Sequence, residues 1–241
     1  MALKFRRVLL KLSGEALKGD RAFGYEMASI RDIADRIKNT VDAGCEIAIV
    51  VGAGNIWRGA KGAAEMDRVQ ADYMGMLATV MNAICLANNL NYCGISAVVQ
   101  SAIPMPPIAS GFDRQAAIAA LESGKVVIFA AGTGSPFFTT DTTSALRALE
   151  MDCDALLKAT KVNGVYSADP FKDPDARRFS SVSYDDAMNM KLGVMDQTAF
   201  SLCRDNNMPI VVFDFSDPCS LDRVVNGDFS AGTIVGGEET Y

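Results

Sequence analysis

The sequence predicts an α/β fold of three layers, with helices covering both faces of a mainly parallel central sheet. Short apolar runs rich in valine, isoleucine and leucine alternate with helical patterns along the 241 residues. The runs are apolar at nearly every position, which is typical of strands buried on both faces. Neither a low-complexity linker nor a repeat divides the chain, so we expect one domain over residues 1–241.

In the N-terminal part, the run RVLLKL predicts a strand at Arg7–Leu12, and the run IAIVV predicts a strand at Ile47–Val51. Between them, apolar residues recur on one helical face and predict a helix at Ser29–Gly44. Ser29 followed by Asp32 resembles a capping box at the start of this helix, and its final glycine suits the end.

In the middle of the chain, a long helical pattern runs from about residue 66 to residue 90. Strands are predicted at Ala97–Gln100 and Val126–Ala130, with a helix near Arg114–Glu122 between them. One side of the long helix is apolar, and it is either core or a subunit contact; its residues are Met74, Leu77, Ala78, Met81, Ile84 and Cys85.

The C-terminal part begins with a predicted helix at Thr142–Met151 and a strand at Ala155–Ala159. Helices near Tyr184–Met190 and Asp196–Asn207 then lead to a strand at Ile210–Asp214. Helices that separate consecutive strands are typical of parallel pairing, which needs a long crossover.

The composition excludes several classes of protein. The net charge of −6 argues against a general nucleic-acid binder, although local cations can still bind an anionic substrate. The chain has no histidine, which excludes Ser-His-Asp and Cys-His catalysis. Its six cysteines form no CxxC pair and are interpreted as buried free thiols in a reducing cytosol. The apolar run that Lys11 interrupts is too short for a signal peptide, and no run is long enough to span a membrane, so we expect a cytoplasmic protein.

Polar loops with glycine follow four of the predicted strands. They are Ser13-Gly14, Gly52–Asn55, Gly132–Ser135 and Thr160–Gly164. Any one of them fits an ordinary turn, but the carboxyl ends of parallel strands meet at one edge of the sheet, where ligands of such folds bind. Glycine lets backbone N–H groups approach an anion closely. The four loops together predict a site for a phosphate-rich ligand.

Two common schemes of phosphate binding do not fit. The chain has no GxxxxGK(S/T) motif, which excludes a P-loop enzyme. Gly52-Ala53-Gly54 and Gly132-Thr133-Gly134 each begin a GxGxxG pattern, but Trp57 and Phe137 replace the third glycine. A dinucleotide site of the Rossmann type is therefore poorly supported.

Five side chains beside these loops could take part in binding or catalysis, and each allows two interpretations. Lys11 lies at the end of an apolar strand, where its ammonium either reaches the surface or binds phosphate. Arg58 either clamps phosphate or is solvated. Asp141 either caps the following helix or orients Lys11 or a Mg²⁺ ion. Tyr166 and Asp169 either contact a nucleobase and its ribose or only pack and cap.

Five motifs together resemble the bacterial uridylate kinases, a branch of the amino acid kinase superfamily. The resemblance runs from about Arg7 to Val235. The first motif alone indicates only the superfamily, whereas the second, third and fourth point to the branch that acts on UMP. The motifs are LLKLSGEAL at 9–17, GAGNIWRG at 52–59, DYMGMLATVMN at 72–82, AGTGSPFFTTD at 131–141 and LKATKVNGVYSADP at 157–170.

This resemblance implies the activity, the assembly and the effectors. The fold would be that of the amino acid kinases, and the reaction would transfer the γ-phosphoryl group of ATP to UMP. Mg²⁺ would arrive with the ATP phosphates, without a metal site of the protein's own. The family forms homohexamers and is usually activated by GTP and inhibited by UTP. The N-terminal part would serve mainly UMP, and the part from about residue 131 mainly ATP.

The resemblance also implies roles for individual residues. Lys11 would bridge the two phosphates, Asp72 would accept hydrogen bonds from ribose hydroxyls, and Thr140 would recognise uracil. The implied catalytic residues are Lys11, Arg58 and Asp141. The implied ATP-binding residues are Lys11, Leu12, Ser13, Gly14, Gly54, Arg58, Thr160, Tyr166 and Asp169. The implied UMP-binding residues are Ala53, Asp72, Thr133, Gly134, Ser135, Pro136, Phe137, Phe138, Thr139 and Thr140.

The chain departs from the family pattern in three places. Ala53 stands where the family has the middle of three consecutive glycines, and its methyl group restricts φ. Asn163 stands where Asp is common; both suit a turn, and Asn163 before a glycine is a hairpin signal. Ala87, Asn91 and Val98 replace basic residues and a histidine associated with GTP in enterobacterial members, so GTP activation would need other residues.

Two rival functions remain open from the sequence. One is another kinase of the superfamily, acting on carbamate, acetylglutamate or aspartate. The other is a non-catalytic nucleotide or oxyanion binder on the same scaffold. Identifying the phosphate acceptor, if there is one, distinguishes these two functions from the phosphorylation of UMP.

Overall fold

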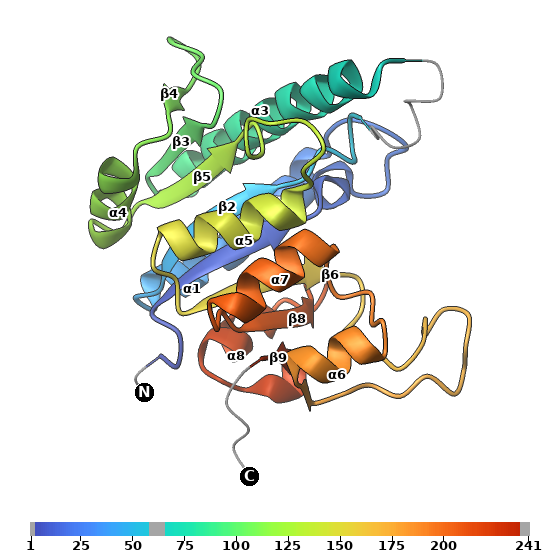
Figure 1. Ribbon diagram of the computed structural model, residues 1–241. Coiled ribbons are helices and arrows are strands. Elements are labelled where there is room, and N and C mark those ends of the chain that lie inside the picture. The colour runs from blue at the N-terminus through green and yellow to red at the C-terminus, as the bar shows by residue number, and fades with distance from the viewer. Residues whose placement is uncertain (1–2, 58–65, 237–241) are drawn as a thin grey trace.

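The computed structural model describes residues 3–57 and 66–236, which form a nine-stranded sheet in the order β4-β3-β5-β2-β1-β6-β8-β9-β7 (Figure 1). Neighbouring strands run parallel except for β8 and β9, which are antiparallel. The predicted mainly parallel sheet is therefore confirmed. The strands are β1 (Arg7–Leu12), β2 (Glu46–Val51), β3 (Ala97–Ser101), β4 (Ser110–Gly111), β5 (Val126–Ala130), β6 (Ala155–Thr160), β7 (Ser181–Val182), β8 (Ile210–Asp214) and β9 (Gly232–Val235).

Helices connect most of the strands. The α-helices are α1 (Met27–Asp42), α3 (Arg68–Tyr92), α4 (Arg114–Glu122), α5 (Thr140–Glu150), α6 (Tyr184–Asn189), α7 (Gln197–Asp205) and α8 (Ser220–Val225). Two short 3₁₀ helices, η1 (Gly14–Lys18) and η3 (Phe229–Ala231), follow β1 and α8.

The helices lie in two layers, one on each face of the sheet. Alternate residues of the central strands enter two separate cores, because successive side chains of a strand point to opposite faces. Leu10 and Ile49 pack with residues of α1, α3 and α8, whereas Leu9 and Val50 pack with residues of α4, α5, α6 and α7. Figure 1 shows α5 and α7 in front of the sheet. The predicted three-layer α/β architecture is confirmed.

The four glycine-bearing loops emerge from four adjacent strands. β5, β2, β1 and β6 are consecutive neighbours in the sheet, and every pair among these neighbours is parallel. Their carboxyl ends therefore lie along one edge. The only shift from the prediction is that Thr160 is the last residue of β6 rather than the first residue of its loop.

Two predicted helix starts are wrong, those of α1 and α5. Glu26, not Ser29, precedes the first residue of α1, and Ser29 Oγ donates a hydrogen bond of 2.5 Å to the Glu26 carboxylate. The predicted Ser29–Asp32 capping box is thus absent. Thr139 caps α5 through hydrogen bonds from the next backbone amides, so this helix begins two residues earlier than predicted.

The hairpin predicted from Asn163-Gly164 is also wrong. The chain leaves β6 for a long connection, in which Tyr166 and Arg178 form an isolated antiparallel bridge. Gly164 is needed here for another reason: its φ is 151°, and a Cβ atom would lie 2.3 Å from Thr233 Oγ1. Close approach of two chain segments, rather than a tight turn, accounts for this glycine.

No helix in the described part of the chain is long and apolar enough to cross a membrane. All six cysteines are free thiols, as predicted, but the predicted burial holds only for Cys45, Cys153 and Cys203. Cys85 and Cys93 are partly buried, and Cys219 is exposed.

Candidate active site

Two lysines and one aspartate form a compact ion cluster at the edge of the sheet. Lys11 of β1 and Lys158 of β6 are register partners on neighbouring strands. Lys11 Nζ lies 2.8 Å from Asp141 Oδ1, and Lys158 Nζ lies 2.9 Å from Asp141 Oδ2. The three side chains are only 13–15% exposed. The cluster therefore holds two positive charges and one negative charge in fixed positions, with one positive charge in excess.

The ion pairs shift the protonation of the cluster. Burial on its own raises the pKa of Asp141, but the ammonium groups of Lys11 and Lys158 outweigh burial and hold that pKa below its ordinary value. Burial lowers the pKa of Lys158, and the like charge of Lys11 lowers it further, against the attraction of Asp141. Lys158 also donates a hydrogen bond to the Val194 carbonyl oxygen.

Asp141 reaches the lysines because α5 begins just before it. Thr139 caps the helix, which leaves the Asp141 carboxylate in the first turn, where the helix dipole favours negative charge. Asp196, the N-cap of α7, accepts hydrogen bonds from the hydroxyl groups of Thr139 and Thr142. Asp141 is thus not the cap of α5, and it contacts Lys11, as the alternative interpretation expected.

The loops after β1 and β2 touch through their backbones. A Cβ atom on Gly14 would lie 2.3 Å from the Gly52 carbonyl oxygen and 2.8 Å from Gly54 N, so only glycine fits at residue 14. Ala53 is not among the non-glycine residues with positive φ. The alanine therefore occupies a backbone conformation that any residue adopts, and its methyl group does not strain this loop.

Two buried amides hold the loop after β2 in place. Asn82 Nδ2 of α3 donates to the Gly52 carbonyl oxygen at 2.7 Å and to Asn55 Oδ1 at 2.8 Å. Asn55 Nδ2 donates in turn to Asn82 Oδ1 and to the Gly24 carbonyl oxygen, both at 3.0 Å. Buried amides satisfied in this way fix a loop rigidly.

A pocket of about 220 Å³ opens between α3 and the loops that follow β2 and β5; we call it the α3 pocket. It contains seven of the ten residues implied for UMP, but Gly134, Pro136 and Phe137 do not line it. Arg68, Thr79 and the Trp57 side chain also line it, although the sequence motifs did not predict a role for them. The lining residues are Ala53, Trp57, Arg68, Ala71, Asp72, Gly75, Met76, Thr79, Gly132, Thr133, Ser135, Phe138, Thr139 and Thr140.

One face of α3 organises this pocket. Asp72 accepts a hydrogen bond of 2.8 Å from Phe137 N, and Thr79 Oγ1 accepts one of 2.9 Å from Ala131 N. Thr79 lies seven residues after Asp72, and Asn82 lies three residues after Thr79, so the three residues share one side of the helix and form a polar seam that faces the protein. Such a seam can be recognised in the sequence, but only the fold shows that it faces inward.

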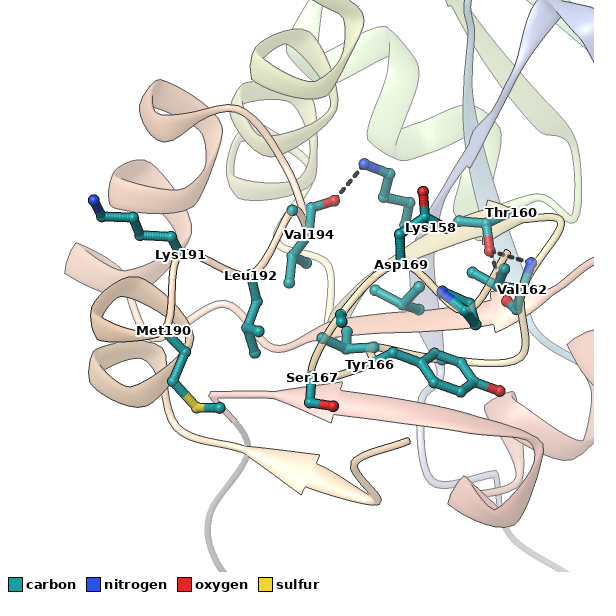
Figure 2. Close-up of a pocket in the computed structure, with 16 residues that line it drawn as sticks. Lys158, Thr160, Val162, Tyr166, Ser167, Asp169, Met190, Lys191, Leu192 and Val194 are labelled. Atoms are coloured by element: carbon teal, nitrogen blue, oxygen red, sulfur yellow. Dashed lines mark hydrogen bonds between the residues drawn. The ribbon is translucent and has the colours of Figure 1, made fainter. Parts of the chain in front are cut away.

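A second pocket, of about 510 Å³, lies beyond β6 on the other side of Lys158; we call it the β6 pocket. Figure 2 shows Thr160 and Tyr166 on one side and the segment 190–194 on the other. Thr160, Tyr166 and Asp169, three of the residues implied for ATP, line it. Tyr166 donates a hydrogen bond of 2.5 Å to Asn163 Oδ1, which fixes the ring.

Asp169 stays ionised at the mouth of the β6 pocket. The backbone N–H of Phe171 donates to its carboxylate at 3.0 Å, and with Lys172 nearby this bond lowers the pKa of Asp169. A carboxylate in this position can accept hydrogen bonds from hydroxyl groups of a ligand.

The ion cluster lies between the two pockets. Lys158 lines the β6 pocket, and Thr140, next to Asp141, lines the α3 pocket. Five predicted residues, Lys11, Leu12, Ser13, Gly14 and Gly54, line neither pocket but belong to β1 and to the loops that touch beside it. Arg58 lies outside the described residues. Lys158 is the member of the ion cluster that was not predicted from the sequence; a lysine within an apolar strand is the signal that could have found it.

Comparison with known proteins gives the same fold and names the family. Residues 6–214 match the Amino acid kinase family. The UMP kinase of Bacillus anthracis is 38% identical, with a TM-score of 0.92 over 96% of both chains. The UMP kinase of Ureaplasma parvum is 36% identical, with a TM-score of 0.90 over 95% of this chain and 98% of that one.

A more distant structure shares the same architecture. The uridylate kinase of Archaeoglobus fulgidus is 28% identical, with a TM-score of 0.73 over 95% of this chain and 99% of that one. Since the family match covers most of the sequence, the chain belongs to the amino acid kinase family.

Proposed function

We propose that this protein transfers the γ-phosphoryl group of ATP to UMP, giving ADP and UDP. The observation that carries the proposal is the Lys11–Asp141–Lys158 cluster between two pockets. The β6 pocket takes ATP and the α3 pocket takes UMP, so their phosphates meet beside the cluster. The likeness to UMP kinases over nearly the whole chain supports the choice of acceptor.

The ion cluster suits phosphoryl transfer because this reaction needs positioned positive charge more than it needs a base. Asp141 holds both ammonium groups in place, so little reorganisation is needed as charge moves from ATP to UMP. In the mechanism that we propose, Lys11 bridges the donor and acceptor phosphates. An oxygen of the UMP phosphate attacks in line, and it is already deprotonated at neutral pH.

The remaining implied residues have supporting roles in this proposal. Backbone amides of Ser13, Gly14 and Gly54 bind phosphate, helped by Arg58. Tyr166, with Thr160 and Asp169, holds the ATP nucleoside. The N-terminal part of the chain then serves mainly the acceptor, and the part after residue 131 serves mainly the donor.

The residues fit a magnesium ion that is carried by ATP. Among the described residues, no group of three or more acidic or cysteine side chains is placed to hold a metal ion, and both Asp141 oxygens contact lysines. We propose that ATP phosphates supply most of the Mg²⁺ ligands, and that the ion neutralises phosphate charge when bound. The expectation that Asp141 also orients the metal stays a prediction.

The outer face of α3 supports the proposal that copies of the chain associate into a homohexamer. Met74, Leu77, Met81 and Ile84 are all exposed on this face, and apolar surface of this kind marks interaction sites. We expect Leu77→Asp combined with Met81→Asp to reduce the assembly to smaller species in light scattering. Phe171→Asp, at an apolar residue outside α3 that is even more exposed than Leu77 and Met81, is the control that keeps the assembly intact. Unchanged mass in the α3 variant would exclude this face as an interface.

Regulation and location follow the family in this proposal. We propose a cytoplasmic enzyme that UTP inhibits. Any activation by GTP uses residues other than Ala87, Asn91 and Val98, since these cannot provide the positive charge that a triphosphate needs.

Asp72→Asn is expected to raise the KM for UMP about 10- to 100-fold and to leave the KM for ATP unchanged. A hydrogen bond from a hydroxyl group to a charged acceptor contributes about 1.5–3 kcal/mol, and the amide lacks the charge. Steady-state rates with one substrate varied at a time measure both constants. Quenching of Trp57, the single tryptophan, gives an independent measure of UMP binding in the α3 pocket.

The control for this variant is Asp67→Asn, because Asn caps a helix as well as Asp does and Asp67 is the N-cap of α3. A selective rise in the KM for ATP would show that the two pockets are assigned the wrong way round. The proposed function itself is tested by incubating the protein with ATP, UMP and Mg²⁺ and separating the nucleotides: UDP and ADP are expected in equal amounts, and their absence contradicts it.

A further inference from the structure

We propose that Arg68 is a positioning residue of the acceptor site, which holds Asp72 and the loop after β5 in the arrangement that binds a nucleoside monophosphate. This inference rests on the proposed function and deepens it. Arg68 is the first residue of α3 and lines the α3 pocket.

Arg68 contacts both parts of the site that it would position. Its Nε lies 2.9 Å from Oδ1 and 2.9 Å from Oδ2 of Asp72, one helical turn further along. Its guanidinium carbon lies 5.5 Å from the centre of the Phe137 ring. Phe137 N donates to Asp72 Oδ2 at 2.8 Å. Each of the three residues therefore contacts the other two, and helix and loop are joined by a closed triangle.

The loop needs this support because of its backbone. Phe137 has a φ of 72°, a left-handed conformation that is unfavourable for a residue with a Cβ atom. The residue is 65% exposed, so core packing does not hold it. The hydrogen bond to Asp72 and the guanidinium over the ring are contacts that stabilise it. Phe138, Thr139 and Thr140, which follow directly, line the pocket and depend on where this residue lies.

The triangle also fixes the carboxylate that the ligand uses. A carboxylate offers about four acceptor positions. Arg68 and the Phe137 amide engage both oxygens of Asp72 and stop the group from rotating, which leaves the remaining lone pairs for a ligand in the pocket that Asp72 lines. The planar guanidinium can pair with a carboxylate and stack on a ring at the same time, whereas a lysine ammonium cannot keep this geometry.

An ordinary surface ion pair is the competing explanation. Pairs of opposite charge four residues apart on a helix stabilise it only slightly, and Arg68 is 49% exposed. Such a pair, however, needs neither a partner that is only 14% exposed nor a third contact with a loop far away in the sequence. The two explanations differ in what they predict for substrate binding.

The test compares Arg68→Met and Arg68→Lys with Arg114→Met. Arg114 is 47% exposed and also pairs with an aspartate, Asp152, so it is a matched control. We expect the KM for UMP to rise about 10-fold in Arg68→Met, with partial recovery in Arg68→Lys. The kcat at saturating UMP and the KM for ATP should stay within about twofold, and Arg114→Met should resemble the wild type. Thermal unfolding and circular dichroism of each variant show that it is folded.

A double-mutant cycle shows whether Arg68 acts through Asp72. In an Asp72→Asn background, Arg68→Met should change the KM for UMP by less than twofold. Additive effects would mean that Arg68 acts independently of Asp72, and an unchanged KM in Arg68→Met would mean that the ion pair is only structural; either result overturns the inference. If the wild type forms no UDP at all, the proposed function fails, whereas UDP formation that is insensitive to Arg68 refutes this inference alone.

Discussion

Replacing Lys11 with methionine is expected to lower kcat for UMP phosphorylation by about 100-fold or more, while the protein stays folded. Removing one group that stabilises transition-state charge in a water-excluded site costs an enzyme about 10²–10³ in kcat. Lys11 is such a group, because its side chain is only 13% exposed and its ammonium is held by Asp141. The variant keeps its structure, since Lys158 still neutralises Asp141 and methionine fills a similar volume.

Steady-state kinetics and thermal unfolding check this prediction together. The KM values should change less than kcat, because an interaction formed mainly in the transition state is lost. Lys18→Met is a suitable control, as Lys18 lies on η1 and donates to the Arg21 carbonyl oxygen, away from Asp141. Turnover near that of the wild type would remove Lys11 from the mechanism.

The second large effect is expected for Asp141→Asn, which should lower both kcat and the free energy of unfolding. The substitution leaves two ammonium groups close together in a site where they are about 85% shielded from water and lack a countercharge. Breaking a buried pair by removing one partner costs about 3–5 kcal/mol. Without the carboxylate between them, Lys11 and Lys158 repel each other, so the phosphate-binding geometry is lost and kcat falls by about 100-fold or more.

The stability effect has a defined pH dependence. The folded-state pKa of Asp141 lies below its ordinary value of 3.8, so the ion pairs stabilise the fold above that pH. This contribution disappears as the pH falls through the folded-state pKa, because the carboxylate is then protonated in both states. Denaturant unfolding at pH 7 should therefore give a higher free energy of unfolding for the wild type than for Asp141→Asn. The difference between the two should shrink below about pH 4.

Asp152→Asn is the control for Asp141→Asn, since Asp152 is 66% exposed and pairs with Arg114 at the surface. Its stability should stay within about 0.5 kcal/mol of the wild type, in line with other surface changes. Equal stabilities of Asp141→Asn and the wild type at pH 7 would show that the ion cluster does not stabilise the fold.

The sequence predicted the sheet well, because buried parallel strands carry a strong local signal. Continuous apolar runs located the central strands, and their polar ends located the edge of the sheet where the pockets open. The short strands β4 and β7, with two residues each, and the antiparallel β9 were missed. Two residues are too few to show a period, and tertiary pairing decides such elements.

The candidate site was only partly predictable for a different reason. Lys11 was identified because a charge interrupts an apolar strand, and Lys158 carries the same signal. Pairing the two lysines requires the register of β1 with β6, which a single sequence does not reveal. Arg68 and Asn82 were missed because polar residues on a long helix usually face solvent. In α3 the polar seam faces the loops, whereas apolar residues such as Leu77 face outward.

The most direct test of the proposed function is the choice of phosphate acceptor. ADP release, measured by a coupled assay with ATP and Mg²⁺, is compared for UMP, CMP, AMP, aspartate, acetylglutamate and carbamate. The proposed sites predict fast release with UMP and rates lower by about 100-fold or more with every other acceptor, since a site that hydrogen-bonds one ligand leaves polar groups unpaired with another. Faster release with an amino acid or carbamate, or no release with any acceptor, would contradict the account.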